Sequence, residues 1–434
     1  MTDAHSAPVA FASLGLIDEV MAGVKQAGFR DCTAIQAQTL PLALTGRDVA
    51  GQAQTGTGKT AAFLVAMYQA LLTRPPPHGR GATSVRALIV APTRELAVQI
   101  HRDALVLGAH TRLKHMVVFG GIDYEKQRTE LSQGCDVLIG TPGRLIDYFK
   151  QHVFDLRHVQ VLVLDEADRM FDLGFIADIR YILRRLPHPQ RRQSMLFSAT
   201  LSHRVLELAY EHMNNPELVR IEPDKMTVDQ VRQLMYYPSM EEKVPLLIGL
   251  LHQTEAVRTM VFVNTKRTAE RLEATLRANG FHAQALSGDV PQNKRLRFLR
   301  DFHDGKLAVL IATDVASRGL HIPDVSHVFN FDLPQDPADY VHRIGRTARA
   351  GAEGDAISFA CEEYAVSLPD IEEYVGHKLP FAPIAKELLA TGVVAGAPAA
   401  RHPGGPRRGG GRPRRGGGSG GGGPRHTRAY RSRR

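Results

Sequence analysis

The chain has 434 residues, which is too long for one ordinary domain and fits two of about 200 residues each. Its apolar fraction of 43% is sufficient for sizeable cores, and its three cysteines are far apart and match no metal-ligand spacing. The first residues do not resemble a signal peptide, and the longest mostly apolar run, 61–72, is too short to cross a bilayer. We therefore expect a cytoplasmic protein without a membrane partner.

The formal net charge of +9 is concentrated at one end of the chain. Residues 401–434, the Arg-rich tail, carry eleven arginines and no lysine, aspartate or glutamate. The rest of the chain holds 43 basic and 45 acidic side chains, a net charge of about −2. Any basic surface on the body must therefore be local.

Apolar runs rich in β-branched residues alternate with helical patterns along both halves of the chain. Such runs suit a parallel sheet covered on both faces, and the alternation with helices predicts an α/β, doubly wound architecture. The expected strands lie at 87–92, 116–121, 136–141, 161–166, 194–200, 259–265, 308–314, 326–332 and 355–360. The polar stretch 214–230 is expected to be a linker between the two sets. After about residue 385 the Ala, Gly, Pro and Arg composition predicts disorder.

The stretch "AQTGTGKT" (53–60) precedes a helical pattern and resembles a phosphate-binding loop. Gly56 and Gly58 allow a tight curl whose N–H groups point at phosphate oxygens, Lys59 supplies a cation and Thr60 a hydroxyl for Mg²⁺. Ala53 replaces the glycine that usually begins the pattern. A turn that only caps a helix is the alternative interpretation. The predicted nucleotide contacts are Ala53, Gln54, Thr55, Gly56, Thr57, Gly58, Lys59 and Thr60.

The stretch "VLVLDEADRM" (161–170) places three carboxylates directly after an apolar strand. In P-loop NTPases an acid at the end of a second strand holds the nucleotide-bound Mg²⁺. We expect Asp165 to have that role, and Glu166 to orient or deprotonate the attacking water. The alternative, a solvated acidic turn, does not explain why the acids follow a phosphate loop by about a hundred residues in the chain.

Many further motifs follow in a fixed order. They are Phe11 with "GFRDCTAIQ" (28–36), "PTRELAVQ" (92–99), Gly120-Gly121, "TPGR" (141–144), "SAT" (198–200), "VFVNT" (261–265), "SGD" (287–289), "QNKR" (292–295), "ATDVASRGLHIP" (312–323) and "HRIGRTAR" (342–349). Over roughly residues 9–380 this series resembles the DEAD-box ATP-dependent RNA helicases. The resemblance implies two tandem RecA-like domains, ATP and Mg²⁺ as cofactors, and single-stranded or short duplex RNA as partner.

The same resemblance implies a role for individual residues. Gln36 would read the adenine and Phe11 stack beside it, although Cys32 and Ala34 replace the usual prolines of that motif. His321, where most of the family has Asp, would contact the ribose. Arg346 and Arg349 would be arginine fingers, with Ala348 in place of the usual glycine. The implied RNA contacts are Thr93, Arg94, Gly121, Thr141, Arg144, Arg295 and Thr313. The implied residues that couple hydrolysis to domain movement are Asp168, Ser198, Thr200, His342 and Arg343.

The motifs also divide the chain. We expect an ATP-binding domain at 1–222, a second helicase domain at 223–385 and the disordered basic segment at 386–434. Within the family, "GQAQTGTGKT" (51–60), "RGLHIP" and the acidic segment 358–380 resemble a bacterial subgroup whose members dock on ribonuclease E in the RNA degradosome. The resemblance therefore implies local unwinding of RNA in support of RNA degradation. General RNA remodelling without a degradosome partner, a DNA helicase and a non-catalytic RNA scaffold are the alternatives.

Overall fold

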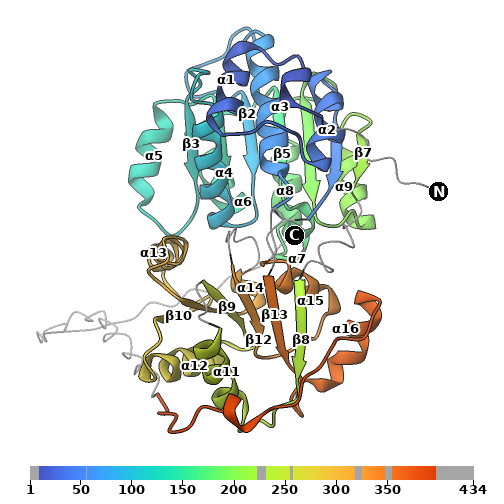
Figure 1. The fold of residues 1–434 in the computed structure, drawn as a ribbon. Helices are drawn as coiled ribbons and strands as arrows, with labels where there is room; N and C mark the ends of the chain where they lie inside the picture. Colours follow the sequence, from blue (N-terminus) through green and yellow to red (C-terminus); the bar gives the residue numbers. More distant parts are fainter. Residues whose placement is uncertain are drawn as a thin grey trace, which may run out of the picture. The chain divides into compact units, whose positions relative to one another are not determined.

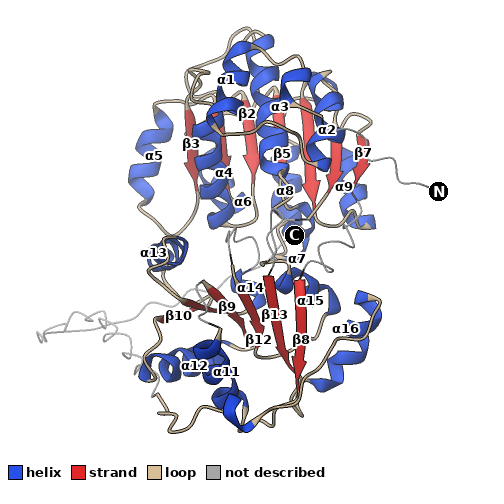
Figure 2. Cartoon of the chain, in the orientation of Figure 1, coloured by secondary structure: helices blue, strands red, loops and turns tan. Residues whose placement is uncertain are grey.

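The structure is a computed structural model that describes residues 9–54, 56–221, 231–254, 258–317, 325–347 and 354–396. Among these residues the strands form two parallel sheets (Figures 1 and 2). The first has the order β3-β4-β2-β5-β6-β1-β7. Its strands are β1 (Val49–Gln52), β2 (Ala87–Val90), β3 (His115–Val118), β4 (Val137–Gly140), β5 (Val161–Leu164), β6 (Gln193–Ser198) and β7 (Glu217–Arg220).

The second sheet has the order β10-β11-β9-β12-β13-β8. Its strands are β8 (Val231–Tyr236), β9 (Thr259–Phe262), β10 (Ala283–Leu286), β11 (Val309–Ala312), β12 (His327–Asn330) and β13 (Gly354–Phe359). All strand pairs of both sheets are parallel, with registers such as Ala87↔Val161 and Thr259↔Val309. The predicted fold class, with two doubly wound parallel sheets, is confirmed.

Helices follow most strands, as the crossover connections of a parallel sheet require. In the first half they are α1 (Asp18–Gln26), α2 (Ala34–Leu44), α3 (Lys59–Thr73), α4 (Arg94–Leu107), α5 (Tyr124–Ser132), α6 (Pro142–Lys150), α7 (Ala167–Asp172), α8 (Ile176–Leu183) and α9 (His203–His212). In the second they are α11 (Lys243–Gln253), α12 (Lys266–Ala278), α13 (Gln292–His303), α14 (Asp314–Ser317), α15 (Pro337–Ile344) and α16 (Leu368–Val375). Short 3-10 turns lie at Phe11–Ser13, Pro189–Arg191, Ala365–Ser367 and Lys386–Leu388. None of the described helices has the length and apolarity that crossing a membrane requires.

The central strands are buried on both faces because helices cover each side of the sheet. On β2 and β5, Ile89 and Val163 pack with α1 to α4, whereas Leu88 and Leu162 pack with α6 to α9. A strand in such a position alternates between two apolar environments instead of between apolar and polar ones. This is why the central strands could be predicted from continuous apolar runs.

The prediction that 214–230 is a linker was wrong for its first part. Residues Glu217–Arg220 form β7, which pairs with β1 in the register Val49↔Glu217. This strand lies at the edge of the sheet and buries only Val219, so its sequence lacks the apolar run of a central strand. The proposed domain boundary at 222 lies outside the described residues. The strands β8 and β10 were also missed.

The prediction of disorder from residue 386 was also too early. Leu388, Leu389 and Val393 pack against the core beneath the second sheet, and Asn279 exchanges two hydrogen bonds with Val394, at 2.8 and 3.0 Å. The segment approaches α11 so closely that a Cβ on Gly249 would lie 1.9 Å from a backbone oxygen. We call residues 379–396 the strap. A few scattered apolar residues pack the strap against the core, and a prediction based on overall composition does not detect them.

Candidate nucleotide and nucleic-acid site

The phosphate loop lies between β1 and α3 and has the backbone that its glycines were predicted to allow. Gly56 and Gly58 have φ values of 90° and 92°, a left-handed conformation that favours glycine. Lys59 begins α3, is 6% exposed, and donates from Nζ to the carbonyl of Ala53 at 2.6 Å. Thr57 closes the turn through its hydroxyl to the carbonyl of Gln54 at 2.8 Å. Thr55 lies outside the described residues.

Gln36, the predicted adenine reader, contacts the phosphate loop directly. Gln36 is 4% exposed, donates from Nε2 to the carbonyl of Gly58 at 3.0 Å, and accepts from the backbone N–H of Thr33 at 2.8 Å. A Cβ on Gly58 would lie 2.4 Å from that Nε2 atom. The ring of Phe11 is buried and stacks on Phe29, with centroids 6.0 Å apart. Gln36 is therefore a candidate adenine reader that is also hydrogen-bonded to the phosphate loop.

The paired acids lie at the carboxyl end of β5, close to Lys59. Asp165 is 2% exposed and accepts the backbone N–H of Glu166 at 3.0 Å. Burial raises the pKa of Asp165 to about 7, with Glu166 and Asp168 acting in the same direction and Lys59 opposing them. Such a carboxyl takes its ionised form most readily when a further cation is bound beside it.

Glu166 has an unusual backbone for its residue type. Its φ of 52° and ψ of 54° are left-handed, a conformation that costs of order 1 kcal/mol or more outside glycine. Its side chain is buried, and its Oε2 atom has no hydrogen-bond partner. The Nη1 atom of Arg169 lies 3.8 Å from that oxygen. A buried carboxylate oxygen without a donor suits the activation of a water molecule.

The third acid connects the DEAD segment to the "SAT" segment. Asp168 Oδ2 accepts from the backbone N–H and the hydroxyl of Thr200, at 2.9 and 3.1 Å. The backbone N–H of Asp168 donates to Ser198 Oγ at 3.1 Å. Three of the five residues predicted to couple hydrolysis to movement, Asp168, Ser198 and Thr200, therefore form one hydrogen-bonded unit.

Two arginines of the "HRIGRTAR" segment are almost fully buried. Arg343 is 1% exposed and binds both oxygens of Asp314, at 2.7 and 2.6 Å. Arg346 is 6% exposed; burial lowers the pKa of its guanidinium, and the carboxylates of Glu166 and Asp314 oppose that effect. Arg346 thus lies near Glu166, whereas His342 is half-exposed and 3.9 Å from Asp339. Arg349, Ala348 and His321 lie outside the described residues.

A polar groove contains most of the predicted RNA contacts. It has a volume of about 560 Å³, and its lining includes Thr93, Arg94, Thr141, Arg144 and Arg295. Gly121 lies beside it, because a Cβ there would be 2.3 Å from Arg94 Nη1. Thr313 is buried and does not line this groove.

Sequence reasoning missed three side chains of the groove. Glu95 accepts from Arg295 Nε at 2.7 Å and from Gln292 Nε2 at 3.1 Å, so a predicted RNA contact is held by an acid. Phe175 places an aromatic ring in the lining. Glu95 and Gln292 stand inside the quoted motifs and could have been selected there. Nothing in the pattern around Phe175 pointed to it.

Arg144 has an aromatic support that the motif did not reveal. Its guanidinium lies over the rings of Tyr124 and Tyr148, 4.8 and 5.2 Å from their centroids, and donates to the Tyr148 hydroxyl at 3.0 Å. Cation–π contacts of this kind hold an arginine without neutralising it. These contacts fix the position of the Arg144 guanidinium in the groove.

A parallel α/β fold with a glycine phosphate loop and buried acids at the adjacent strand ends defines a P-loop NTPase. The family model "DEAD/DEAH box helicase" matches residues 33–208, and "Helicase conserved C-terminal domain" matches 242–351. The chain belongs to the DEAD-box family of ATP-dependent RNA helicases, which hydrolyse ATP. The predicted family and enzyme class are confirmed.

Curated relatives and solved structures agree with this assignment. ATP-dependent RNA helicase RhlB of Xanthomonas axonopodis pv. citri is 60% identical, over 90% of this chain and 68% of that protein. RhlB of Shewanella frigidimarina is 53% identical, over 93% of both. The S. cerevisiae Dbp5 structure bound to RNA and ADP BeF3 has a TM-score of 0.76 at 34% identity, over 86% of this chain and 95% of that one. Mss116p bound to ssRNA and AMP-PNP has a TM-score of 0.77 at 26% identity, over 89% and 82%.

Proposed function

We propose that this helicase binds ATP with Mg²⁺, grips single-stranded RNA and separates short RNA duplexes locally. The proximity of the buried Arg346 to Glu166 carries the proposal, because it brings a cation from the turn after α15 to the acid that follows β5. Similarity to RNA-bound and nucleotide-bound structures supports it. The domain limits proposed are 1–222 and 223–396, followed by a basic segment.

Each residue of the phosphate site has a distinct task in this proposal. The loop amides and Lys59 bind the β- and γ-phosphates, while Thr60 and Asp165 supply hard oxygen ligands of the kind Mg²⁺ prefers. Bound Mg²⁺ would neutralise phosphate charge. Glu166 orients the attacking water and accepts its proton. Arg346, with Arg349, stabilises the γ-phosphoryl charge, a contribution of about 10³–10⁵ in related systems.

The groove provides contacts suited to a nucleic-acid backbone. Thr93 and Thr141 offer hydroxyls, and Arg94 and Arg144 offer guanidinium groups. Such groups bind phosphates and sugars and carry little sequence information. RNA and ATP favour the same arrangement of the residues of the two helicase domains. Binding of either ligand should therefore raise the affinity for the other.

We further propose that the protein acts in the cytoplasm and supports RNA degradation beside ribonuclease E. The resemblance of "GQAQTGTGKT" (51–60), "RGLHIP" and the acidic segment 358–380 to a bacterial subgroup that docks on ribonuclease E supports this. Binding of ribonuclease E, measured by sedimentation with the purified proteins, tests it. A helicase that is active but does not associate would be a general RNA remodeller.

Steady-state ATPase activity with single-stranded RNA, single-stranded DNA and neither tests the central proposal. We expect strong stimulation by RNA, little by DNA and a low basal rate. Equal stimulation by DNA would favour a DNA helicase or translocase. RNA binding without any ATP hydrolysis would indicate a non-catalytic scaffold.

A further inference from the structure

The two sheets have the same strand order once the extra edge strand β7 is set aside. In chain order, β1 to β6 of the first sheet correspond to β8 to β13 of the second, and both sheets read third, fourth, second, fifth, sixth, first. Each position of the nucleotide site therefore has a counterpart in the second sheet. The counterpart of the phosphate loop is the segment between β8 and α11.

Two residues of the second sheet occupy the places of Lys59 and Asp165. Six residues, 53–58, separate β1 from α3, which begins at Lys59, and six residues, 237–242, separate β8 from α11, which begins at Lys243. Asp165 directly follows β5, and Asp332 lies two residues after the corresponding strand β12. The lysine and the acid of a phosphate site are thus both present.

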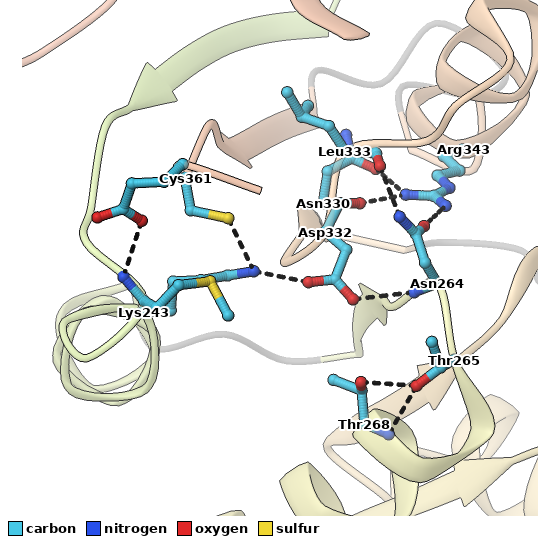
Figure 3. Close-up of polar contacts among 11 residues, drawn as sticks. Lys243, Asn264, Thr265, Thr268, Asn330, Asp332, Leu333, Arg343 and Cys361 are labelled. Carbon is cyan, nitrogen blue, oxygen red and sulfur yellow. Dashed lines mark hydrogen bonds and ion pairs between the residues drawn. The ribbon is translucent and has the colours of Figure 1, made fainter. Parts of the chain in front are cut away.

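This second pair is closed on itself. Lys243 Nζ lies 2.6 Å from Asp332 Oδ1, and the two side chains are 2% and 3% exposed (Figure 3). The ammonium group is also 3.6 Å from the sulfur of Cys361 and lies over the rings of Phe331 and Tyr364, 4.3 and 5.1 Å from their centroids. The aspartate, the sulfur and the rings therefore surround the ammonium group of Lys243.

The loop before Lys243 is also unsuited to phosphate. It contains no glycine, and it ends in Glu241 and Glu242. The carboxylate of Glu242 accepts the backbone N–H and the hydroxyl of Ser239, at 2.9 and 3.0 Å. An acid that takes up a loop amide repels an anion where the first loop attracts one.

The pair is connected to the buried arginine of the other motif. Asp332 Oδ2 accepts the backbone N–H of Asn264 at 2.9 Å, and the Asp332 carbonyl accepts from Arg343 Nη1 at 2.6 Å. Asn264 Oδ1 accepts from Arg343 Nη2 at 2.9 Å (Figure 3). The carbonyl of Arg343 in turn accepts the backbone N–H of Arg346 at 3.1 Å.

We propose that Lys243 and Asp332 are a counterpart of the phosphate-binding pair that no longer binds nucleotide and instead positions Arg343 and, through it, Arg346. Lys243 is therefore a positioning residue for ATP hydrolysis, not a ligand of ATP. The inference rests on the proposed finger role of Arg346. It predicts that Lys243 affects turnover more than ATP binding.

The test compares Lys243→Met with Lys243→Gln/Asp332→Asn, which replaces the ion pair by a neutral amide pair of similar shape. Lys243→Met leaves a buried carboxylate without its cation, and the displaced network should lower kcat at saturating ATP and RNA by about 10- to 100-fold. The affinity for an ATP analogue without RNA should stay within about twofold, because the first sheet holds the nucleotide. The amide pair should restore kcat to within about threefold of wild type.

Leu246→Ala is the matched control, because Leu246 is fully buried on the same helix and outside the network. It should lower the melting temperature as Lys243→Met does, with kcat unchanged at a temperature where both are folded. If Lys243→Met does not fold, Lys243→Gln replaces it in the test. Glutamine keeps a donor for Asp332, so the expected loss of kcat is smaller, at least about threefold.

Wild-type kcat from Lys243→Met, or an equal loss from Leu246→Ala, would overturn the inference and leave a merely structural ion pair. A folded amide-pair variant as slow as Lys243→Met would also overturn it. Measuring the wild-type protein in the same assay distinguishes a failure of the proposed function from a failure of the positioning role of Lys243. An inactive wild type would refute the proposed function, whereas an active wild type with an unaffected Lys243→Met refutes only the positioning role.

Discussion

Asp168 holds Thr200 by two hydrogen bonds, one from the backbone N–H at 2.9 Å and one from the hydroxyl at 3.1 Å. Asp168 lies two residues after Glu166, and Thr200 lies two residues after the end of β6. We expect a shift of these acids on hydrolysis to be transmitted to that segment through the Asp168 carboxylate. The hydroxyl contact can be removed without removing the backbone contact.

Thr200→Val should separate RNA unwinding from ATP hydrolysis. Valine keeps the shape and the backbone N–H of threonine but lacks the hydroxyl. Asp168 therefore keeps one of its two hydrogen bonds to residue 200, and the loss of the other costs about 1 kcal/mol. We expect strand displacement of a short duplex to slow by at least about fivefold while RNA-stimulated phosphate release stays within about twofold. Ser202→Ala, which removes a nearby exposed hydroxyl, is the control. A parallel loss of both activities would show that Thr200 serves hydrolysis itself.

Glu166→Gln should bind ATP and RNA but not turn over. The amide keeps the size of the side chain and cannot accept a proton from water, and general-base catalysis contributes about 10²–10⁴ in rate. Rapid-quench measurement of a single turnover should show a loss of at least about a hundredfold, and RNA should dissociate more slowly with ATP bound. Turnover near the wild-type rate would remove Glu166 from the mechanism.

The sequence predicted those parts of the site that local chemistry dictates. The glycines Gly56 and Gly58 predict a left-handed backbone, and the acids that follow an apolar run predict the carboxyl end of strand β5. Contacts between distant segments carry no such local mark. Gln36 on Gly58, twenty-two residues away, and Lys243 on Asp332, eighty-nine residues away, became visible only once strand order was known. Edge strands such as β7 escaped because they bury one face at most.

The pH dependence of stability should reflect the partly buried His115 on β3. Burial, with the neighbouring His101, lowers the pKa of His115 to about 4, and its Nε2 lies 2.9 Å from the Tyr68 hydroxyl. The unfolded chain binds this proton near pH 6.5 and the folded chain does not. The contribution of the neutral ring is therefore complete above pH 6.5 and is lost as pH falls toward 4, by up to about 3 kcal/mol.

His115→Gln should accordingly lose less stability than the wild type on acidification. Chemical unfolding at pH 7.5, 6, 5 and 4.5 measures the difference between the two proteins, in which the titration of all other groups largely cancels. The variant should be less stable at pH 7.5, and the gap should narrow steadily toward pH 4.5. A gap that does not change with pH would show that His115 is not protonated on unfolding.

Gly249→Ala should reveal whether the strap is part of the folded protein in solution. In an open helix this change stabilises by about 1 kcal/mol, because alanine is the better helix former. Beneath the strap the new methyl group would meet the Leu388 carbonyl at 1.9 Å. We therefore expect destabilisation and faster proteolysis between residues 379 and 396. A rise in melting temperature would mean that the strap does not lie on α11.

Removing residues 401–434 should weaken RNA binding at low salt without slowing the chemistry. The Arg-rich tail lies outside the described residues, so the argument rests on its composition: eleven arginines, no acid and one aromatic residue, Tyr430. Neutralising single-strand phosphates lowers log K by roughly 0.7 per contact for each unit of log salt, so four engaged arginines would add a slope of roughly 3. The truncated protein should show a flatter salt dependence of RNA affinity in a fluorescence titration.

Its maximal ATPase rate at saturating RNA should be unchanged, because every motif assigned to hydrolysis precedes residue 350. Equal affinity and equal salt slope for both proteins would leave the tail as a solubilising segment only.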